Sequence, residues 1–119
     1  MGPDDVSNDW ADLLDQLLAF RAERDWAQFH TPKNLAASIS IEAAELLEVF
    51  QWSNELDHLS NHKRVQAEKE IADVLIYLIL ISHELGIDAL AAAKCKIVEN
   101  AAKYPVGKAK GNATKYSEM

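Results

Sequence analysis

Four acidic residues stand in two pairs, each with the spacing of one helical turn. Glu42 and Glu45 form a Glu-x-x-Glu pair, and Glu70 and Asp73 form a Glu-x-x-Asp pair. At about 100° per residue, this spacing places both carboxylates of a pair on one face of a helix. The same faces carry apolar side chains, namely Leu35, Leu46 and Val49 for the first pair and Val74 and Ile81 for the second. A carboxylate in such surroundings is costly unless it is paired or binds a metal ion.

The two pairs together predict a metal site built from oxygen ligands. Two facing helices would bring the four carboxylates together, and no histidine or cysteine joins them at ligand spacing. This chemistry suits Mg²⁺ or Mn²⁺. Glu48 lies about 60° outside Glu45 on the same helix and is either a flanking catalytic acid or a surface residue. The alternative is that the acids are solvated or form ion pairs with Arg21, Arg24 or Lys96.

Aromatic residues accompany the acidic pairs. Trp26, Phe29 and His30 follow the first apolar helical stripe, whereas Trp52 and Tyr77 lie on the faces of the carboxylates. Aromatic side chains at helical spacing are most often core residues. Beside a metal-bound phosphate, however, they could also stack on a nucleobase.

Helical periodicity and capping residues predict an all-α fold that positions these groups. Thr31-Pro32 is an N-cap followed by proline at the first helical position, and Asp88 is a second candidate N-cap. Gly86 is suited to ending a helix. We expect four helices, over residues 8–28, 32–54, 63–85 and 89–103, with a polar loop over residues 53–62.

The chain is expected to contain one domain. Residues 1–7 are interpreted as a disordered N-terminus or a cloning remnant, and residues 8–104 as the helical domain. Residues 105–119 have no helical stripe and are expected to form a basic C-terminal arm carrying Lys108, Lys110 and Lys115. The third helix is almost entirely apolar between Ile71 and Ile81, which predicts that a second subunit covers part of it.

Composition excludes several classes of protein. The chain has 119 residues, of which 49% are hydrophobic, so it can form a core. A net charge of −7 argues against general nucleic-acid binding, and a single cysteine excludes an internal disulfide. The longest apolar run, from Val74 to Ile81, is much shorter than the roughly 20 residues of a membrane span. We therefore expect a cytoplasmic protein without nucleic-acid or membrane partners.

With these motifs in order, the sequence resembles the MazG-like, all-α nucleoside triphosphate pyrophosphohydrolases, and within them the dCTP pyrophosphatase-like branch. The resemblance rests on ERDWAQFHTPKNL from Glu23, EAAELLEVFQW from Glu42, EIADVLIYL from Glu70, ENAAKYPV from Glu99 and the closing ATKYSE. Leu17 departs from it, because the dCTP-specific eukaryotic members have a histidine at this position near the nucleotide.

The resemblance implies a metal-dependent hydrolase that cleaves a nucleoside triphosphate, such as dCTP or a modified dCTP, to the monophosphate and pyrophosphate. Such an activity removes unwanted nucleotides from the cellular pool. The implied metal ligands are Glu42, Glu45, Glu70 and Asp73, with Mg²⁺ or Mn²⁺ as cofactor and Glu48 as a possible orienter of water. The implied substrate-binding residues are Trp26, Phe29, His30, Trp52, Tyr77, Lys96 and Asn100. A homodimer, or a homotetramer formed as a dimer of dimers, is also implied.

Three alternatives stay open at this point. The same fold could act on other NTPs or dNTPs. A ferritin-like di-iron protein would need two Glu-x-x-His motifs, and the only candidate, Glu55 to His58, falls in the polar loop. A non-catalytic helical interaction module would carry its acidic residues only for solubility.

Overall fold

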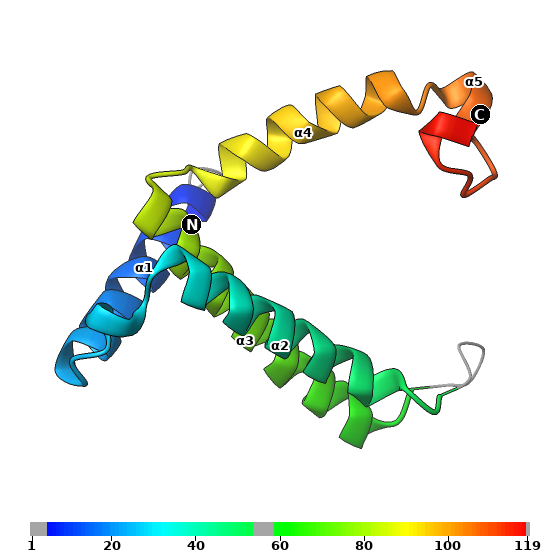
Figure 1. Cartoon of the computed structure of the whole chain (residues 1–119). Helices are drawn as coiled ribbons and strands as arrows, with labels where there is room; N and C mark the ends of the chain where they lie inside the picture. Colours follow the sequence, from blue (N-terminus) through cyan, green and yellow to red (C-terminus); the bar gives the residue numbers. More distant parts are fainter. Residues whose placement is uncertain (1–4, 54–58, 119) are drawn as a thin grey trace. The chain divides into compact units, whose positions relative to one another are not determined.

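The computed structural model describes residues 5–53 and 59–118, and every regular element within them is a helix, so the predicted all-α class is confirmed for this part of the chain. Figure 1 shows the elements, which are α1 (Asp5–Glu23), η1 (Ala27–Phe29), α2 (Pro32–Phe50), α3 (Asn61–Leu85), α4 (Ala89–Lys103), α5 (Val106–Ala109) and η2 (Tyr116–Glu118). The chain divides into two compact units, Met1–Gly86 and Ile87–Met119.

The first unit consists of α1, α2 and α3 around a small core. Helix α2 runs alongside α3 over most of its length, and α1 contacts α3 as well (Figure 1). Leu35 and Ile79 are each only 1% exposed, and Leu80 and Ala67 are also buried. The packing of α2 against α3 places the two predicted acidic segments opposite each other.

Side-chain caps set where α2 and α3 begin. The Thr31 hydroxyl accepts a hydrogen bond from the Asn34 N–H at 3.2 Å, and Pro32 occupies the first turn of α2. The Ser60 hydroxyl accepts one from the Lys63 N–H at 3.2 Å and so begins α3 at Asn61. Gly86 ends α3 with φ +65°, a left-handed conformation that glycine adopts without a steric penalty. These three boundaries agree with the sequence prediction to within two residues.

Helix α1 ends earlier than predicted, at Glu23 rather than near residue 28. Asp25 has φ +55°, and the Trp26 N–H returns to the Arg21 carbonyl at 2.9 Å, which closes the helix. Aspartate tolerates the left-handed region better than most residues. The Gln28 amide donates to both the Asp25 carbonyl and its carboxylate at 3.0 Å. The chain therefore turns here, and this turn positions Trp26 and His30.

Helix α2 also ends before its predicted limit, at Phe50. Gln51 and Trp52 form a turn, and the Ser53 N–H donates to the Phe50 carbonyl at 3.0 Å. The Lys63 ammonium donates to the Ser53 hydroxyl and so connects this turn with α3. Residues 54–58 of the predicted loop, including Glu55 and His58, lie outside the described residues, and its last two residues, 61 and 62, belong to α3.

The second unit contains α4, α5 and η2. Helix α4 has its predicted bounds, and the Asp88 carboxylate caps it by accepting from the Ala91 N–H at 3.0 Å. The C-terminal arm, for which the sequence shows no helical stripe, contains two short helices, α5 and η2. The Tyr116 ring explains part of this order, since it packs edge-on against Tyr104 at 5.9 Å and lies 5.0 Å from the Lys103 ammonium.

No single helix among the described residues is long and apolar enough to cross a membrane, and only α3 joined with α4 reaches that length and composition. Many large apolar side chains are nevertheless exposed. On α3, Ile71 is 54% exposed, and Leu75 and Leu78 are also exposed. These residues belong to the apolar segment from Ile71 to Ile81, which the sequence predicts to be partly covered by a second subunit.

Candidate active site

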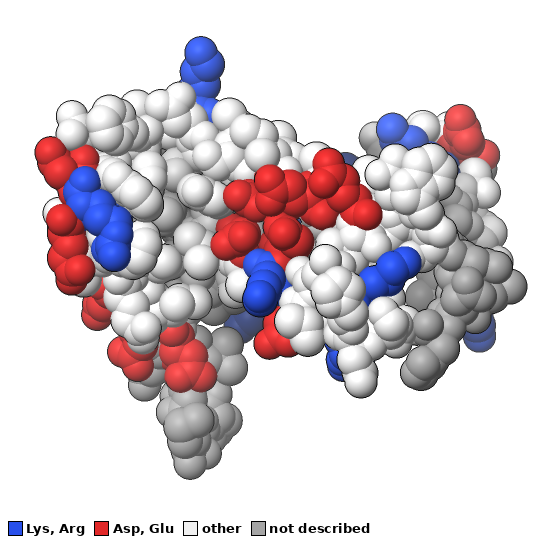
Figure 2. All heavy atoms as spheres, turned by 90° about the horizontal axis from the view of Figure 1, so that it is seen from below, with Lys and Arg blue, Asp and Glu red and all other residues white. Residues whose placement is uncertain are grey.

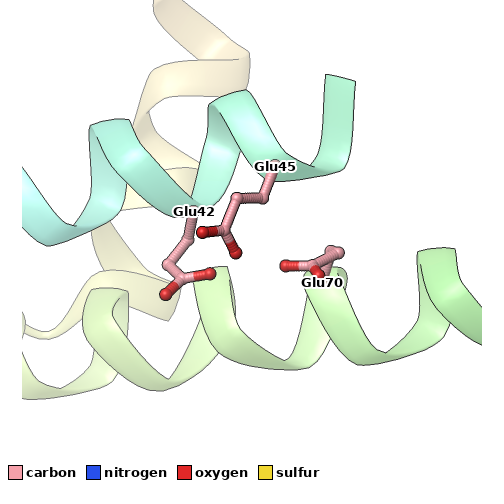
Figure 3. A group of neighbouring side chains, drawn as sticks. All are labelled: Glu42, Glu45 and Glu70. Carbon is pink, nitrogen blue, oxygen red and sulfur yellow. The ribbon is translucent and has the colours of Figure 1, made fainter. Parts of the chain in front are cut away.

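Three carboxylates from two facing helices meet between α2 and α3. Glu42 and Glu45 point from α2 toward Glu70 on α3 (Figure 3). Each offers one oxygen, and these three oxygens lie within 4.8 Å of one another. The structure thus brings together three of the four predicted metal ligands.

Asp73, the fourth predicted ligand, lies on α3 one turn beyond Glu70. It is half-buried and outside the group of three, but its charge acts on both Glu42 and Glu70. Figure 2 shows acidic side chains gathered in a patch near the centre of the viewed face. Four carboxylates in one small region repel one another unless protons or cations compensate their charge.

The electrostatics of the cluster show this repulsion. The pKa of the Glu42 carboxyl is raised to about 7, mainly by desolvation and then by the hydrogen bond and charge of Glu45. Desolvation followed by the charge of Glu45 also raises the pKa of the Glu70 carboxyl. The Oε2 atoms of Glu42 and Glu70 are buried and have no hydrogen-bond partner in the described part of the chain. Unpartnered carboxylate oxygens crowded together fit a divalent cation.

The basic residues considered as ion-pair partners of these acids pair with other acids in the described residues. Arg21 binds Glu84 at 2.6 Å, Arg24 lies 3.7 Å from Glu23, and Lys96 lies 3.0 Å from Glu99. These three basic residues are therefore not the ion-pair partners of Glu42, Glu45, Glu70 or Asp73 in the described part of the chain.

An open groove of about 490 Å³ lies beside the carboxylates, and we call it the acidic groove. Its lining residues are Glu45, Glu48, Val49, Trp52, Lys63, Gln66 and Glu70. Glu48 and Trp52 thus lie next to the cluster, and the Trp52 ring is 90% exposed. Sequence reasoning missed Lys63 and Gln66. The signal for Lys63 was its position seven residues before Glu70, which places both on the same face of α3.

A second cavity, of about 300 Å³, lies between α1 and α3 and is mostly apolar. This aromatic cavity is lined by Leu13, Gln16, Leu17, Phe20, Arg21, Trp26, His30, Ile76, Tyr77 and Leu80. The rings of Phe20 and Trp26 meet edge-on at 5.7 Å. Three of the predicted substrate-binding residues, Trp26, His30 and Tyr77, therefore share one cavity. Phe29 is 58% exposed and does not line it.

The aromatic cavity disfavours the protonated form of the His30 imidazole. Burial lowers the pKa of its imidazole, the nearby Arg21 charge lowers it further, and the Glu84 charge opposes this only in part. Its Nδ1 atom is buried without a hydrogen-bond partner. A neutral ring of this kind offers one donor and one acceptor to a ligand.

The two predicted phosphate-side residues of α4 belong to the second unit. Lys96 and Asn100 are both exposed, and the Lys96 ammonium is paired with Glu99. The Asn100 carbonyl accepts the Tyr104 N–H at 2.8 Å. A substrate role for these two residues stays a prediction.

Comparisons with known proteins show the family to which the chain is similar. The MazG-like family matches residues 37–119, which include all four predicted ligands. A pyrophosphatase from Archaeoglobus fulgidus has a similar structure, with a TM-score of 0.75 and 48% sequence identity, over 80% of this chain and 91% of that one.

Mammalian dCTP pyrophosphatase 1 proteins are similar in sequence. The bovine protein is 38% identical over 84% of this chain, and the human protein is 36% identical over the same share. The matched region spans 62% of the bovine and 61% of the human protein. This chain therefore corresponds to about three fifths of the length of those relatives.

Proposed function

The chain belongs to the MazG-like family, and from that premise we propose that it is a metal-dependent nucleoside triphosphate pyrophosphohydrolase. It would cleave the bond between the α- and β-phosphates and release a monophosphate and pyrophosphate. The observation that carries this proposal is the meeting of Glu42, Glu45 and Glu70, whose oxygens lie within 4.8 Å of one another.

Glu42, Glu45 and Glu70 would hold the cation, and Asp73 would complete the site from one turn along α3. A set of carboxylate oxygens favours Mg²⁺, with Mn²⁺ as the second choice. When bound, such an ion supplies charge neutralisation for the phosphates and lowers the pKa of water. The unpartnered Oε2 atoms of Glu42 and Glu70 support this assignment, because ligation would satisfy both.

Residues of the acidic groove have separate tasks in this proposal. The Lys63 ammonium lines the groove and can contact a phosphate oxygen, since it is a cation with several N–H donors. Glu48 lines the same groove and would orient the attacking water as a hydrogen-bond acceptor. Trp52 would cover the substrate from the rim.

The aromatic cavity would take the base. Tyr77 lies seven residues after Glu70 on α3, so the two side chains share a face and are separated by about 10 Å along the helix axis. The sugar of a nucleotide can bridge such a distance. Trp26 and Tyr77 provide rings for stacking, and the similarity to mammalian dCTP pyrophosphatase 1 supports dCTP or a modified dCTP as the substrate.

A homodimer or homotetramer would complete the fold. Leu47 on α2 is 69% exposed, and Ile97 and Val98 on α4 are 68% and 73% exposed. Burial of such side chains is worth roughly 1.5–3 kcal/mol each, so a second copy of the chain that covers them gains substantial free energy. We place the protein in the cytoplasm, where a nucleotide pool is available for sanitation.

A substrate panel tests the proposed function. Pyrophosphate release is measured with the canonical dNTPs and NTPs and with methylated and halogenated dCTP, in Mg²⁺, in Mn²⁺ and in chelator. We expect cytidine nucleotides to give the highest kcat/KM, with no turnover in chelator. Glu45→Gln should lose most activity, whereas Glu68→Gln, which removes an exposed acid elsewhere on α3, should not. Cleavage of purines alone would exclude dCTP, and turnover in chelator would exclude the metal.

A further inference from the structure

Arg21 is a buried charged residue in a mostly apolar cavity. It lies on α1, is only 8% exposed and lines the aromatic cavity together with Trp26 and Tyr77. Its Nη2 binds Glu84 on α3 at 2.6 Å. Its Nη1 is also buried but has no hydrogen-bond partner in the described part of the chain.

An unpartnered guanidinium nitrogen of this kind is costly for the free protein. Arginine stays protonated at any physiological pH, so the group cannot avoid the cost by losing its charge. A buried donor left without an acceptor loses the hydrogen bonds that water would give it. Because Glu84 fixes the planar guanidinium through Nη2, the orientation of Nη1 is fixed as well. The wall of the cavity therefore includes an arginine with one oriented and unpartnered donor.

We propose that Arg21 is a specificity-determining residue, whose Nη1 donates a hydrogen bond to a carbonyl oxygen of the base in the aromatic cavity. This inference rests on the proposed function, and it adds which atom of the base the protein recognises. In cytosine the carbonyl oxygen is O2, so Arg21 would donate its hydrogen bond to O2. Trp26 and Tyr77 would contact the faces of the base. Glu84 is the positioning residue, since it touches Arg21 and not the base.

The neighbouring groups in the cavity favour this assignment. Burial and the Arg21 charge lower the pKa of the His30 imidazole, which disfavours a second cation beside Arg21 in this cavity. Leu13, Leu17, Ile76 and Leu80 offer no hydrogen bonds, and Gln16, which also lines the cavity, has an uncharged amide. In an apolar wall, one charged donor discriminates strongly, because a base without a matching acceptor leaves that donor buried and unpaired.

The test compares dCTP with 2-thio-dCTP, whose sulfur is a poor acceptor, and with the abasic deoxyribose triphosphate. For the wild type we expect kcat/KM to be roughly 10- to 100-fold higher for dCTP than for the thio analogue, as for loss of a charged hydrogen bond. Arg21→Met should reduce this ratio to about one and leave abasic turnover within about twofold of the wild type. Arg64→Met, which removes an exposed arginine of α3, is the matched control and should keep the wild-type ratio.

Two further variants keep the result clear. The double variant Arg21→Met/Glu84→Gln removes both charges, so it leaves no unpaired carboxylate and remains usable if the single variant unfolds. Glu84→Gln alone should lower the dCTP to 2-thio-dCTP ratio, because Arg21 loses its anchor. An unchanged ratio in the double variant would overturn the role of Arg21 while the proposed function stands. Loss of abasic turnover would also overturn it, and a wild type that cleaves no triphosphate would refute the proposed function itself.

Discussion

At the scale of single residues, the proposed chemistry depends on carboxylates placed where they repel one another. Glu42 and Glu70 each leave one buried oxygen without a partner, and Glu45 acts on both through its charge. Such an arrangement destabilises the free protein. The repulsion would therefore lower the stability of the metal-free fold and raise the affinity of the site for a cation.

Asp73→Asn separates a metal-binding role from a structural one. The change removes one negative charge with little change in shape, so in chelator the fold should be as stable as the wild type or more stable. In Mg²⁺ most turnover should be lost, because a neutral amide is a poorer ligand. Thermal unfolding in both buffers and pyrophosphate release provide the measurement. A variant that unfolds much earlier in chelator yet keeps near-normal turnover would contradict the role of Asp73.

The raised pKa of Glu42 predicts how stability depends on pH. Its folded-state pKa is about 7, against an ordinary value of 4.5, so the folded protein holds a proton that the unfolded chain has released. In chelator, stability should therefore fall as the pH rises from 4.5 to about 7. Saturating Mg²⁺ should remove this fall, because the cation favours the ionised form.

Thermal unfolding across that pH range measures the effect, with Glu42→Gln as the reference. The variant should show a smaller loss of stability in chelator, since its amide does not titrate. If the wild type and the variant had the same pH dependence, the raised pKa of Glu42 would not be its cause.

At the scale of elements, α3 carries most of the site. It presents Lys63, Glu70, Asp73 and Tyr77 along one side, and it packs against both α1 and α2. The Ser60 cap begins this helix, and the Lys63 side chain connects it with the turn at Ser53. The position of α3 thus sets the spacing between the carboxylates and the aromatic cavity.

Removal of the Ser60 cap should destabilise the fold without changing the chemistry. Ser60→Ala removes the acceptor for the Lys63 N–H, which should lower the free energy of unfolding by about 1 kcal/mol. Urea denaturation measures this loss, and kcat should stay near the wild-type value. Ser40→Ala, within α2 and exposed, is the control and should be almost neutral. A near-neutral Ser60→Ala would show that the cap does not stabilise α3.

Helix existence was predictable here because capping residues and apolar periodicity agree at most boundaries. Helical periodicity also predicted that Glu42 and Glu45 on α2 face Glu70 on α3. The early end of α1 did not, because it depends on the positive φ of Asp25, which its residue type permits but does not require. Arg21 was predicted only as a possible partner of the acids, since its pairing with Glu84 depends on how α1 meets α3.

At the scale of the whole molecule, the chain buries few of its apolar residues. It is 49% hydrophobic, yet among the described residues the buried apolar side chains are Leu35, Ala67, Ile79 and Leu80. A chain of this size normally buries about two thirds of the surface that it exposes when unfolded. Exposed residues such as Leu47 and Ile97 are therefore consistent with the proposed oligomer.

Sedimentation should show a particle of two or four times the 13.3 kDa of one chain. Ile97→Lys and Leu47→Lys each place a charge on an apolar face, and at least one of them should shift the particle toward the monomer. Lys69→Glu, a change on the exposed surface of α3, serves as the control for added charge. A wild type that sediments as a monomer at all concentrations would contradict the oligomer.

The most direct test of the central claim is the identity of the products formed from dCTP. Phosphorus NMR of a reaction in Mg²⁺ distinguishes cleavage at the α–β bond from cleavage at the β–γ bond. We predict dCMP and pyrophosphate with the wild type, and almost no reaction with Glu45→Gln, whose oxygen belongs to the carboxylate cluster. Formation of dCDP and orthophosphate, or equal turnover by Glu45→Gln and the wild type, would contradict the account.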